Sequence, residues 1–264
     1  MKLKRFFIPG ILLLLAGILC FAAVFLKHGF DPTRLTPRVY VGKMADYEDV
    51  SSIIVDDKNA SVRIMRADIG RVSVTYSDCD EEWYDLTWDG STLRITKHEQ
   101  FVFRLFSFDF YRPELIIAIP KDYDGVLNIE TINGSIRAED VCASDGYFTT
   151  MNGEIRVSGG FDSLRAHTTN GAVTLDGVAA PELISAVTTN GEVNFIILHA
   201  NEVIVKTTNG EVGGSIVGDE TDWQISASTV NGRNDLKNRT DGEKKLTVQT
   251  TNGSIGVQFV QTGK

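Results

Sequence analysis

Acidic residues that recur at one position of a repeated pattern are the first candidates for chemistry in this 264-residue chain. Glu154, Glu192 and Glu211 each stand two residues after the Asn of an Asn-Gly pair. Carboxylates aligned on an outer face could cleave glycans as an acid and a base, or hold a cation such as Ca²⁺. Ser135 and Ala172 take the same place in other units, so the column has gaps. We therefore expect a solvated edge, with no catalytic residue and no metal site.

The remaining residues show no signature of an enzyme. The four histidines are scattered without the spacing of metal ligands, and neither a Gly-x-Ser-x-Gly elbow nor a phosphate-binding glycine loop occurs. With 26 basic and 35 acidic residues, the net charge of −9 argues against binding to nucleic acid phosphates. We predict a protein that is not an enzyme, has no cofactor and binds no nucleic acid. A glycan-active β-helix enzyme, lyase or hydrolase, is the alternative, and a structural spacer is a third possibility.

The strongest pattern is a series of seven Asn-Gly pairs at intervals of 18 to 22 residues. A Thr stands two residues before every Asn, and apolar residues alternate with polar ones on both sides, so each unit reads as strand, turn and strand. The asparagines are Asn133, Asn152, Asn170, Asn190, Asn209, Asn231 and Asn252. The threonines are Thr131, Thr150, Thr168, Thr188, Thr207, Thr229 and Thr250.

Two architectures fit such a repeat, a parallel β-solenoid and an antiparallel hairpin meander or barrel. The repeated Thr favours the solenoid, because equivalent residues of successive coils then stack at about 4.8 Å. We predict an all-β solenoid of about seven to ten coils, with the Asn and Thr residues as a structural ladder in its interior. Gly after each Asn would supply a left-handed turn conformation. Asn190→Ala in the middle should then destabilise more than Asn252→Ala at the end.

The N-terminal segment reads as a membrane anchor. Residues 6–26 contain no charge and follow Lys2, Lys4 and Arg5. Twenty-one apolar residues in a helix span about 30 Å, the thickness of the hydrocarbon core of a bilayer. The fold class we predict is thus a β-solenoid preceded by one transmembrane helix, in a single-pass protein of the cell membrane. The positive-inside rule places residues 1–5 in the cytoplasm and the acidic remainder outside it. A cleaved signal peptide is the alternative.

The rest of the chain divides into three parts. Residues 27–50 read as a linker, residues 51–126 as irregular β coils that cap one end, and residues 127–264 as the repeated solenoid. Residues 257–260 lie near the C-terminus with little chain left to cover them, so we expect an uncapped edge there. Cys79 and Cys142 are either thiols or a single disulfide.

A run of aromatic residues interrupts the N-terminal coils at residues 101–111. It contains five of the 14 phenylalanines. It either packs over the core or forms an exposed interaction patch that touches a membrane or a partner. The residues of that patch are Phe101, Phe103, Phe106, Phe108, Phe110 and Tyr111.

The Thr-x-Asn-Gly-x-Ile/Val units from Thr131 to Ile255, with Ile119-Pro120-Lys121 before them, resemble a bacterial family of adhesin-like proteins of unknown function. That family includes LiaG-like envelope proteins, and the resemblance covers about residues 50–260. It implies a membrane-tethered or surface β-solenoid that binds an envelope protein or a cell-surface glycan. It also implies a role in adhesion or in the envelope stress response. Asn234 and Gly214 depart from the apolar pattern, so the coils around residues 210–240 fit least well.

Overall fold

The computed structural model describes residue 10 and residues 13–20, 22–23, 38–100 and 113–261. The chain forms two compact units, which are considered separately. One contains Met1–Val39 and Val102–Phe110, and the other contains Tyr40–Phe101 and Tyr111–Lys264. The aromatic run at residues 101–111 and the predicted cytoplasmic residues 1–5 lie outside the described residues.

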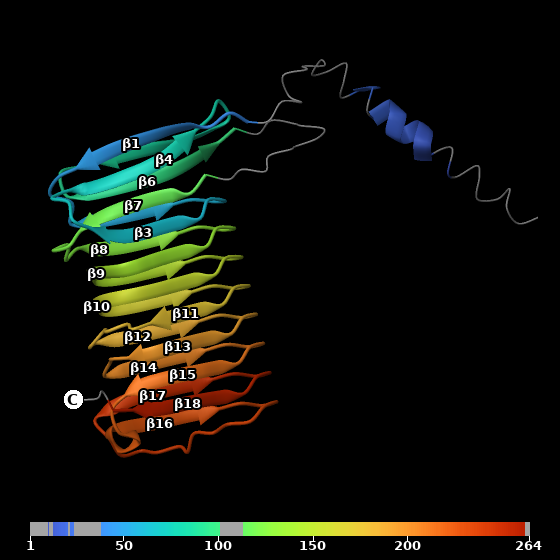
Figure 1. Cartoon of the computed structure of the whole chain (residues 1–264). Coiled ribbons are helices and arrows are strands. Elements are labelled where there is room, and N and C mark those ends of the chain that lie inside the picture. The colour runs from blue at the N-terminus through green and yellow to red at the C-terminus, as the bar shows by residue number, and fades with distance from the viewer. Residues whose placement is uncertain (1–9, 11–12, 21, 24–37, 101–112, 262–264) are drawn as a thin grey trace, which may run out of the picture. The chain divides into compact units, whose positions relative to one another are not determined.

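The prediction of a transmembrane helix over residues 6–26 is wrong. In the described part of the chain, no helix is both long enough and apolar enough to span a bilayer. Among the described residues of this segment, residues 13–20 form a short, exposed helical stretch (Figure 1). The all-β part of the predicted fold class fits the structure.

The second unit consists of 18 described strands and one short 3₁₀ helix, η2 (Glu220–Asp222). The N-terminal strands are β1 (Val41–Tyr47), β2 (Ser52–Asp56), β3 (Val62–Ala67), β4 (Val72–Asp78), β5 (Glu82–Trp88), β6 (Thr92–Glu99), β7 (Leu115–Pro120) and β8 (Val126–Glu130). The strands that follow are β9 (Ile136–Thr149), β10 (Ile155–His167), β11 (Val173–Asp176), β12 (Leu183–Val187), β13 (Val193–Leu198), β14 (Glu202–Lys206), β15 (Val212–Val217), β16 (Trp223–Ser228), β17 (Lys244–Gln249) and β18 (Ile255–Val260).

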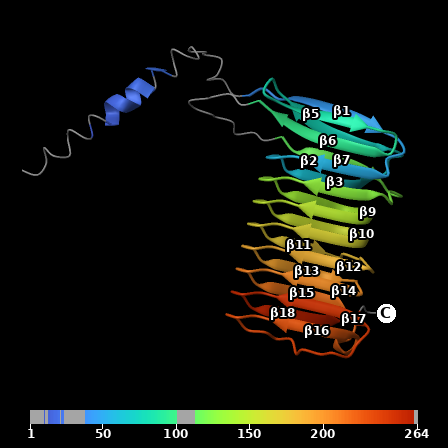
Figure 2. The same ribbon diagram turned by 180° about the vertical axis from the view of Figure 1, so that it is seen from behind.

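The repeated strands stack in parallel. Strands that precede an Asn-Gly turn form one sheet, in which β12 pairs with β10 and with β14. Strands that follow a turn form the other, in which β13 pairs with β11 and with β15. Equivalent residues are in register, as where Ala166 lies opposite Ala186. An antiparallel meander would reverse neighbouring strands, so the repeated part is a parallel solenoid whose coils follow one another in Figures 1 and 2.

The N-terminal coils are irregular and partly antiparallel. β4 pairs antiparallel with β1 and with β7, and β5 pairs antiparallel with β6. A hairpin turn at Asp89-Gly90 joins β5 to β6, and the Asp89 carboxylate accepts hydrogen bonds from the backbone N–H groups of Ser91 and Thr92. β1 occupies residues that the sequence assigned to a linker, so that assignment is wrong for Val41–Tyr47.

At the C-terminal end, the order of the coils in space differs from their order in the chain. β17 lies between β14 and β16, and β18 pairs with β15. The last coil in the sequence is therefore inserted under the coil of β14 and β15, and the coil of β16 comes after it in the stack. The chain beyond β16 closes this end, where Ile225 and Arg239 exchange backbone hydrogen bonds. Among the described residues, β18 pairs with β15 on one side and makes only the isolated bridge between Asn234 and Ile255 on the other, so residues 257–260 belong to the last strand of their sheet.

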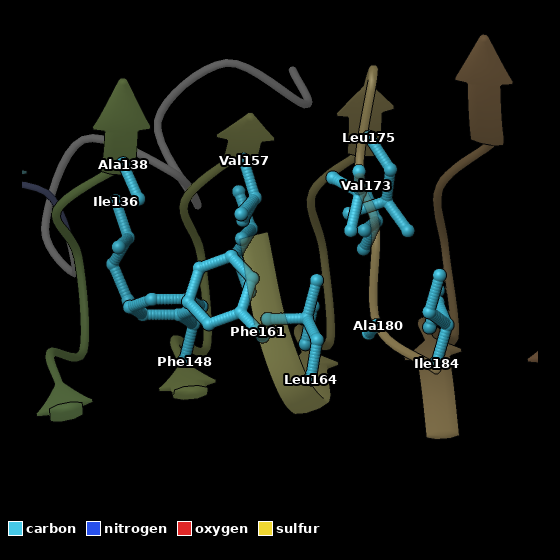
Figure 3. Close-up of a cluster of buried hydrophobic side chains, with 14 of the residues drawn as sticks. Ile136, Ala138, Phe148, Val157, Phe161, Leu164, Val173, Leu175, Ala180 and Ile184 are labelled. Atoms are coloured by element: carbon cyan, nitrogen blue, oxygen red, sulfur yellow. The ribbon is translucent and has the colours of Figure 1, made fainter. Parts of the chain in front are cut away.

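The core lies between the two sheets and is built mainly from alternate residues of the strands that follow β1. Figure 3 shows Phe148, Phe161 and Leu164 pointing into it from β9 and β10. The Phe148 and Phe161 rings meet edge to face with centroids 6.2 Å apart, a favourable aromatic geometry. Ala166 and Ala186 are fully buried as well, which keeps the sheets close at that level.

Candidate functional site

The repeated Thr points inward and binds the neighbouring turn. The hydroxyl of Thr168 donates a hydrogen bond of 2.9 Å to the carbonyl oxygen of Gly153, one coil earlier. Thr188 makes the same bond to Gly171 at 2.8 Å. The equivalent donors in the other repeats are Thr150, Thr207, Thr229 and Thr250. A buried hydroxyl needs such a partner, so every turn is tied to the next one.

The repeated Gly is required by close contact between turns. A Cβ placed on Gly171 would lie 1.8 Å from the carbonyl oxygen of Gly153, and one on Gly191 would lie 2.0 Å from that of Gly171. No glycine of the seven Asn-Gly pairs is among the described residues with positive φ. The prediction that these glycines adopt a left-handed turn is therefore wrong. The carbonyl that accepts the Thr hydroxyl leaves no room for a side chain.

The repeated Asn forms a continuous ladder. Asn152 donates from Nδ2 to Oδ1 of Asn133 at 2.7 Å, and Asn170 donates in the same way to Asn152 at 2.8 Å. These side chains are exposed, so the ladder runs along an edge of the solenoid and not through its interior, where we expected it. Asn252 bonds to Asn209, and Asn231 bonds to Asn252. Asn231 is therefore the end member, and the assignment of Asn252 to the end is wrong.

The ladder begins one turn earlier than predicted, at Asn59. Asn133 donates from Nδ2 to Oδ1 of Asn59 at 2.8 Å. Ala60 takes the place of Gly there. A Cβ placed on Gly134 would lie 1.8 Å from the carbonyl oxygen of Ala60. The same oxygen accepts a hydrogen bond from the Thr131 hydroxyl. The apolar residues four before and three after Asn59 follow the repeat, which is the signal that could have revealed it.

A buried polar cluster fixes this first turn. One carboxylate oxygen of Asp57 accepts the backbone N–H groups of Asn59 and Ala60, and the other accepts the hydroxyl of Tyr84. Burial and the nearby Asp57 carboxylate raise the pKa of Tyr84. The Lys97 ammonium lies 4.3 Å from the centroid of the Tyr84 ring. Asp57 occupies the position that Thr has in later repeats, and its carboxylate holds the turn through the N–H groups of Asn59 and Ala60.

The residue directly before each Asn points outward and forms what we call the turn ridge. Its members are Ile132, Met151, Thr169, Thr189, Thr208, Val230 and Thr251. The exposed fraction is 38% for Ile132, 51% for Met151 and 75% for Val230. Ile132 and Met151 lie on adjacent coils, since the Met151 N–H donates to the Ile132 carbonyl. Lys58, which precedes Asn59, begins the same row, so the ridge starts with an exposed lysine and carries large apolar side chains at Ile132, Met151 and Val230.

The acidic column does not assemble a metal site. Glu154 pairs with Arg156 at 2.7 Å, while Glu192 and Glu211 are exposed on adjacent coils. Within the described ranges, no group of three or more His, Cys, Asp and Glu side chains is placed to hold a metal ion. Cys79 and Cys142 are free thiols.

The edge opposite the Asn-Gly turns carries a pocket that the sequence did not reveal. This corner pocket has a volume of about 450 Å³ and is lined by Ala179, Pro181, Val217, His199, Asn201 and Lys244. The residues come from successive coils and follow no repeat. Just before it, Ile197 has a φ of 55°, and Ile196 and Ile197 are 53% and 44% exposed. A positive φ is strained for a β-branched residue.

Comparison with known families identifies the domain. Residues 50–264 match the model of the family described as Toastrack DUF4097. The chain belongs to the Toastrack DUF4097 family. The Toastrack domain accounts for both the irregular N-terminal coils and the repeated solenoid.

Two solved structures are similar to this Toastrack chain. A "putative adhesin" from Bacteroides fragilis is 13% identical, with a TM-score of 0.51, over 83% of this chain and 97% of that one. A "putative adhesin" from Parabacteroides distasonis is 11% identical, with a TM-score of 0.45, over 84% and 98%. No curated protein matches the chain. At these identities, the first structure establishes a shared fold.

Proposed function

We propose that this Toastrack domain is an adhesin-like binding module that holds a macromolecular partner along the turn ridge. The observation that carries the proposal is the exposure of Ile132, Met151 and Val230 on a regular, rigid edge. Ile132 and Met151 lie on adjacent coils, and neighbouring large apolar side chains at a protein surface commonly mark interaction sites. The names of the solved structures with this fold support the same function.

The ridge is well suited to binding because its backbone is already ordered. Each ridge residue lies between the Thr that bonds to the adjacent turn and the Asn of the ladder. The Met151 segment is held by Thr150 bonded to Gly134 and by Asn152 bonded to Asn133. A preorganised surface loses little conformational entropy when a partner binds.

We also propose that the domain works at the bacterial cell envelope on its extracytoplasmic side. The resemblance to LiaG-like envelope proteins supports this location and an association with the envelope stress response. An envelope protein or a cell-surface glycan is the partner that such a location offers. Protease added to intact cells should digest the domain if the location is right, and it should spare the domain if the location is wrong.

The experiment that tests the binding surface places a photo-crosslinking amino acid at Met151 in cells. The matched control places it at Asp162, an exposed residue away from the turn ridge. We expect one reproducible crosslinked partner from position 151, lost when Ile132→Asp is added and absent from position 162. The same set of crosslinks from both positions would contradict the proposal.

A further inference from the structure

The corner pocket has the composition of a small-ligand site. Its volume of about 450 Å³ lies within the usual range for ligand pockets. Apolar side chains of Ala179, Pro181 and Val217 form part of its wall, and His199, Asn201 and Lys244 supply the polar groups. A mainly apolar wall with a few polar groups is the common arrangement in such sites.

The charge of the pocket is opposite to that of the protein. The chain carries a net charge of −9, yet the side chains that line the pocket include Lys244 and no carboxylate. The Lys244 ammonium lies 5.4 Å from the centroid of the Trp223 ring. This ammonium is half-buried, and it forms no ion pair or hydrogen bond with a carboxylate of the described residues. A cation held in this way favours an anionic ligand.

The backbone beside the pocket has the positive φ that recurs at the corner of earlier coils, at Asp140, Gly159 and Gly177. Ile197 keeps a φ of 55°, stabilised by a hydrogen bond of 2.9 Å from its N–H to the hydroxyl of Ser215. A Gly would adopt this conformation without strain, but it would remove an exposed aliphatic side chain two residues before His199. The aliphatic groups of Ile196 and Ile197 extend the apolar surface next to the pocket.

We propose that the corner pocket binds the C-terminal residue of a peptide, with its carboxylate at Lys244 and an aliphatic side chain against Pro181 and Val217. The side chains of His199 and Asn201 make no hydrogen bond to the described residues, so both are available to the peptide amide. A fatty acid would satisfy Lys244 but would make no hydrogen bond to these two exposed groups, which would stay bonded to water. The site lies opposite the turn ridge and does not depend on it.

The test is an NMR titration of the folded domain with three small probes. Acetyl-leucine carries the carboxylate, the aliphatic side chain and the amide, acetyl-leucine amide lacks the charge, and hexanoate lacks the amide. We expect acetyl-leucine to shift the signals of His199, Asn201 and Lys244, and both other probes to bind about tenfold more weakly. A tenfold difference is what one charge-assisted hydrogen bond at a partly exposed site provides.

Variants make the result specific to the pocket. Lys244→Met should abolish the preference for acetyl-leucine over its amide, whereas Lys245→Met, a change at the next and exposed lysine, should leave it intact. Circular dichroism confirms that both variants fold. Equal binding of acetyl-leucine and its amide would overturn the proposal. Equal binding of hexanoate and acetyl-leucine would overturn it too, as would an unchanged preference in Lys244→Met.

Discussion

The two edges of the solenoid are formed by the same coils, but one edge repeats its contacts from coil to coil and the other does not. At the Asn-Gly edge, each coil repeats three contacts, namely a Thr hydroxyl to a Gly carbonyl, a Gly against that carbonyl and an Asn amide to an Asn amide. At the opposite edge the register shifts between Phe195 and Leu198, and the recurring positive-φ position is occupied by residues of different type, namely Asp140, Gly159, Gly177 and Ile197. One edge therefore determines how coils stack, and the other is free to vary and to form a pocket.

The difference follows from how closely the backbones approach. At the Asn-Gly edge, the carbonyl oxygen of one turn lies so close to the Gly of the next that no side chain fits there. Gly therefore recurs at this position in every Asn-Gly turn. Where turns are further apart, residues as different as Gly177 and Ile197 occupy the positive-φ positions. Specific recognition is consequently more easily built on the irregular edge, and a broad, regular contact surface on the other.

The largest effect should come from filling the space at the regular edge. Gly171→Ala brings a Cβ to within 1.8 Å of a backbone oxygen, so the coils must separate, and we expect a loss of about 3 kcal/mol or more in the free energy of unfolding. Gly213→Ala is the control, because its Cβ would have no neighbour nearer than 3.6 Å. Urea denaturation measures both. Equal losses would show that close contact is not the reason for the repeated Gly.

Removal of one inward hydroxyl should have the next largest effect. Thr168→Val keeps the shape but leaves the Gly153 carbonyl without its donor, which should cost about 1–2 kcal/mol. Thr174→Val, at a strand position whose hydroxyl makes no bond to the described residues, should change stability by less than about 0.5 kcal/mol. The same denaturation experiment compares them, and equal effects would argue against the hydroxyl as the link between turns.

The asparagine ladder should show a smaller, position-dependent effect. Asn190→Ala removes two side-chain hydrogen bonds, to Asn170 and from Asn209, and should cost about 1 kcal/mol. Asn231→Ala at the end removes only the bond to Asn252 and should cost about half as much. Asn252→Ala should resemble Asn190→Ala, because Asn252 lies within the ladder. A cost for Asn252 like that of Asn231 would contradict the observed order of coils.

At the irregular edge, relief of strain should give the smallest change, and of opposite sign. Ile197→Gly removes an unfavourable left-handed conformation and should stabilise the domain by about 0.5 kcal/mol, after allowance for the greater entropy of Gly in the unfolded chain. Ile196→Gly, with no positive φ to relieve, should destabilise it. Thermal melting distinguishes the two, and a lower melting temperature for Ile197→Gly would mean that its backbone is not strained.

The sequence predicted the repeated part of the fold well because each repeat makes identical contacts. Thr, Asn and Gly recur where the coils touch, and this spacing alone favoured parallel stacking. The order of the last coils could not be predicted, because β16 and β17 carry the same alternation and either one fits beside β14. Asn59 was missed because a terminal turn needs neither Thr before it nor Gly after it.

The corner pocket was beyond prediction for a related reason. Its residues are separated by up to 65 positions, from Ala179 to Lys244, and meet only because an inserted coil brings Lys244 beside Asn201. The transmembrane helix was predicted from the uncharged run of residues 6–26 after three basic residues, whereas no helix in the described part of the chain is long and apolar enough to span a bilayer.

The stacking of the turns, with the last coil inserted, is tested most directly by disulfide formation in a background where Cys20, Cys79 and Cys142 are replaced by Ser. In the structure, Asn209 and Asn252 are on adjacent coils, about 4.8 Å apart, whereas Asn209 and Asn231 are separated by two coils. Asn209→Cys with Asn252→Cys should therefore crosslink readily on mild oxidation, and Asn209→Cys with Asn231→Cys should not, since a disulfide needs Cα atoms within about 7 Å. The reverse pattern would contradict the account.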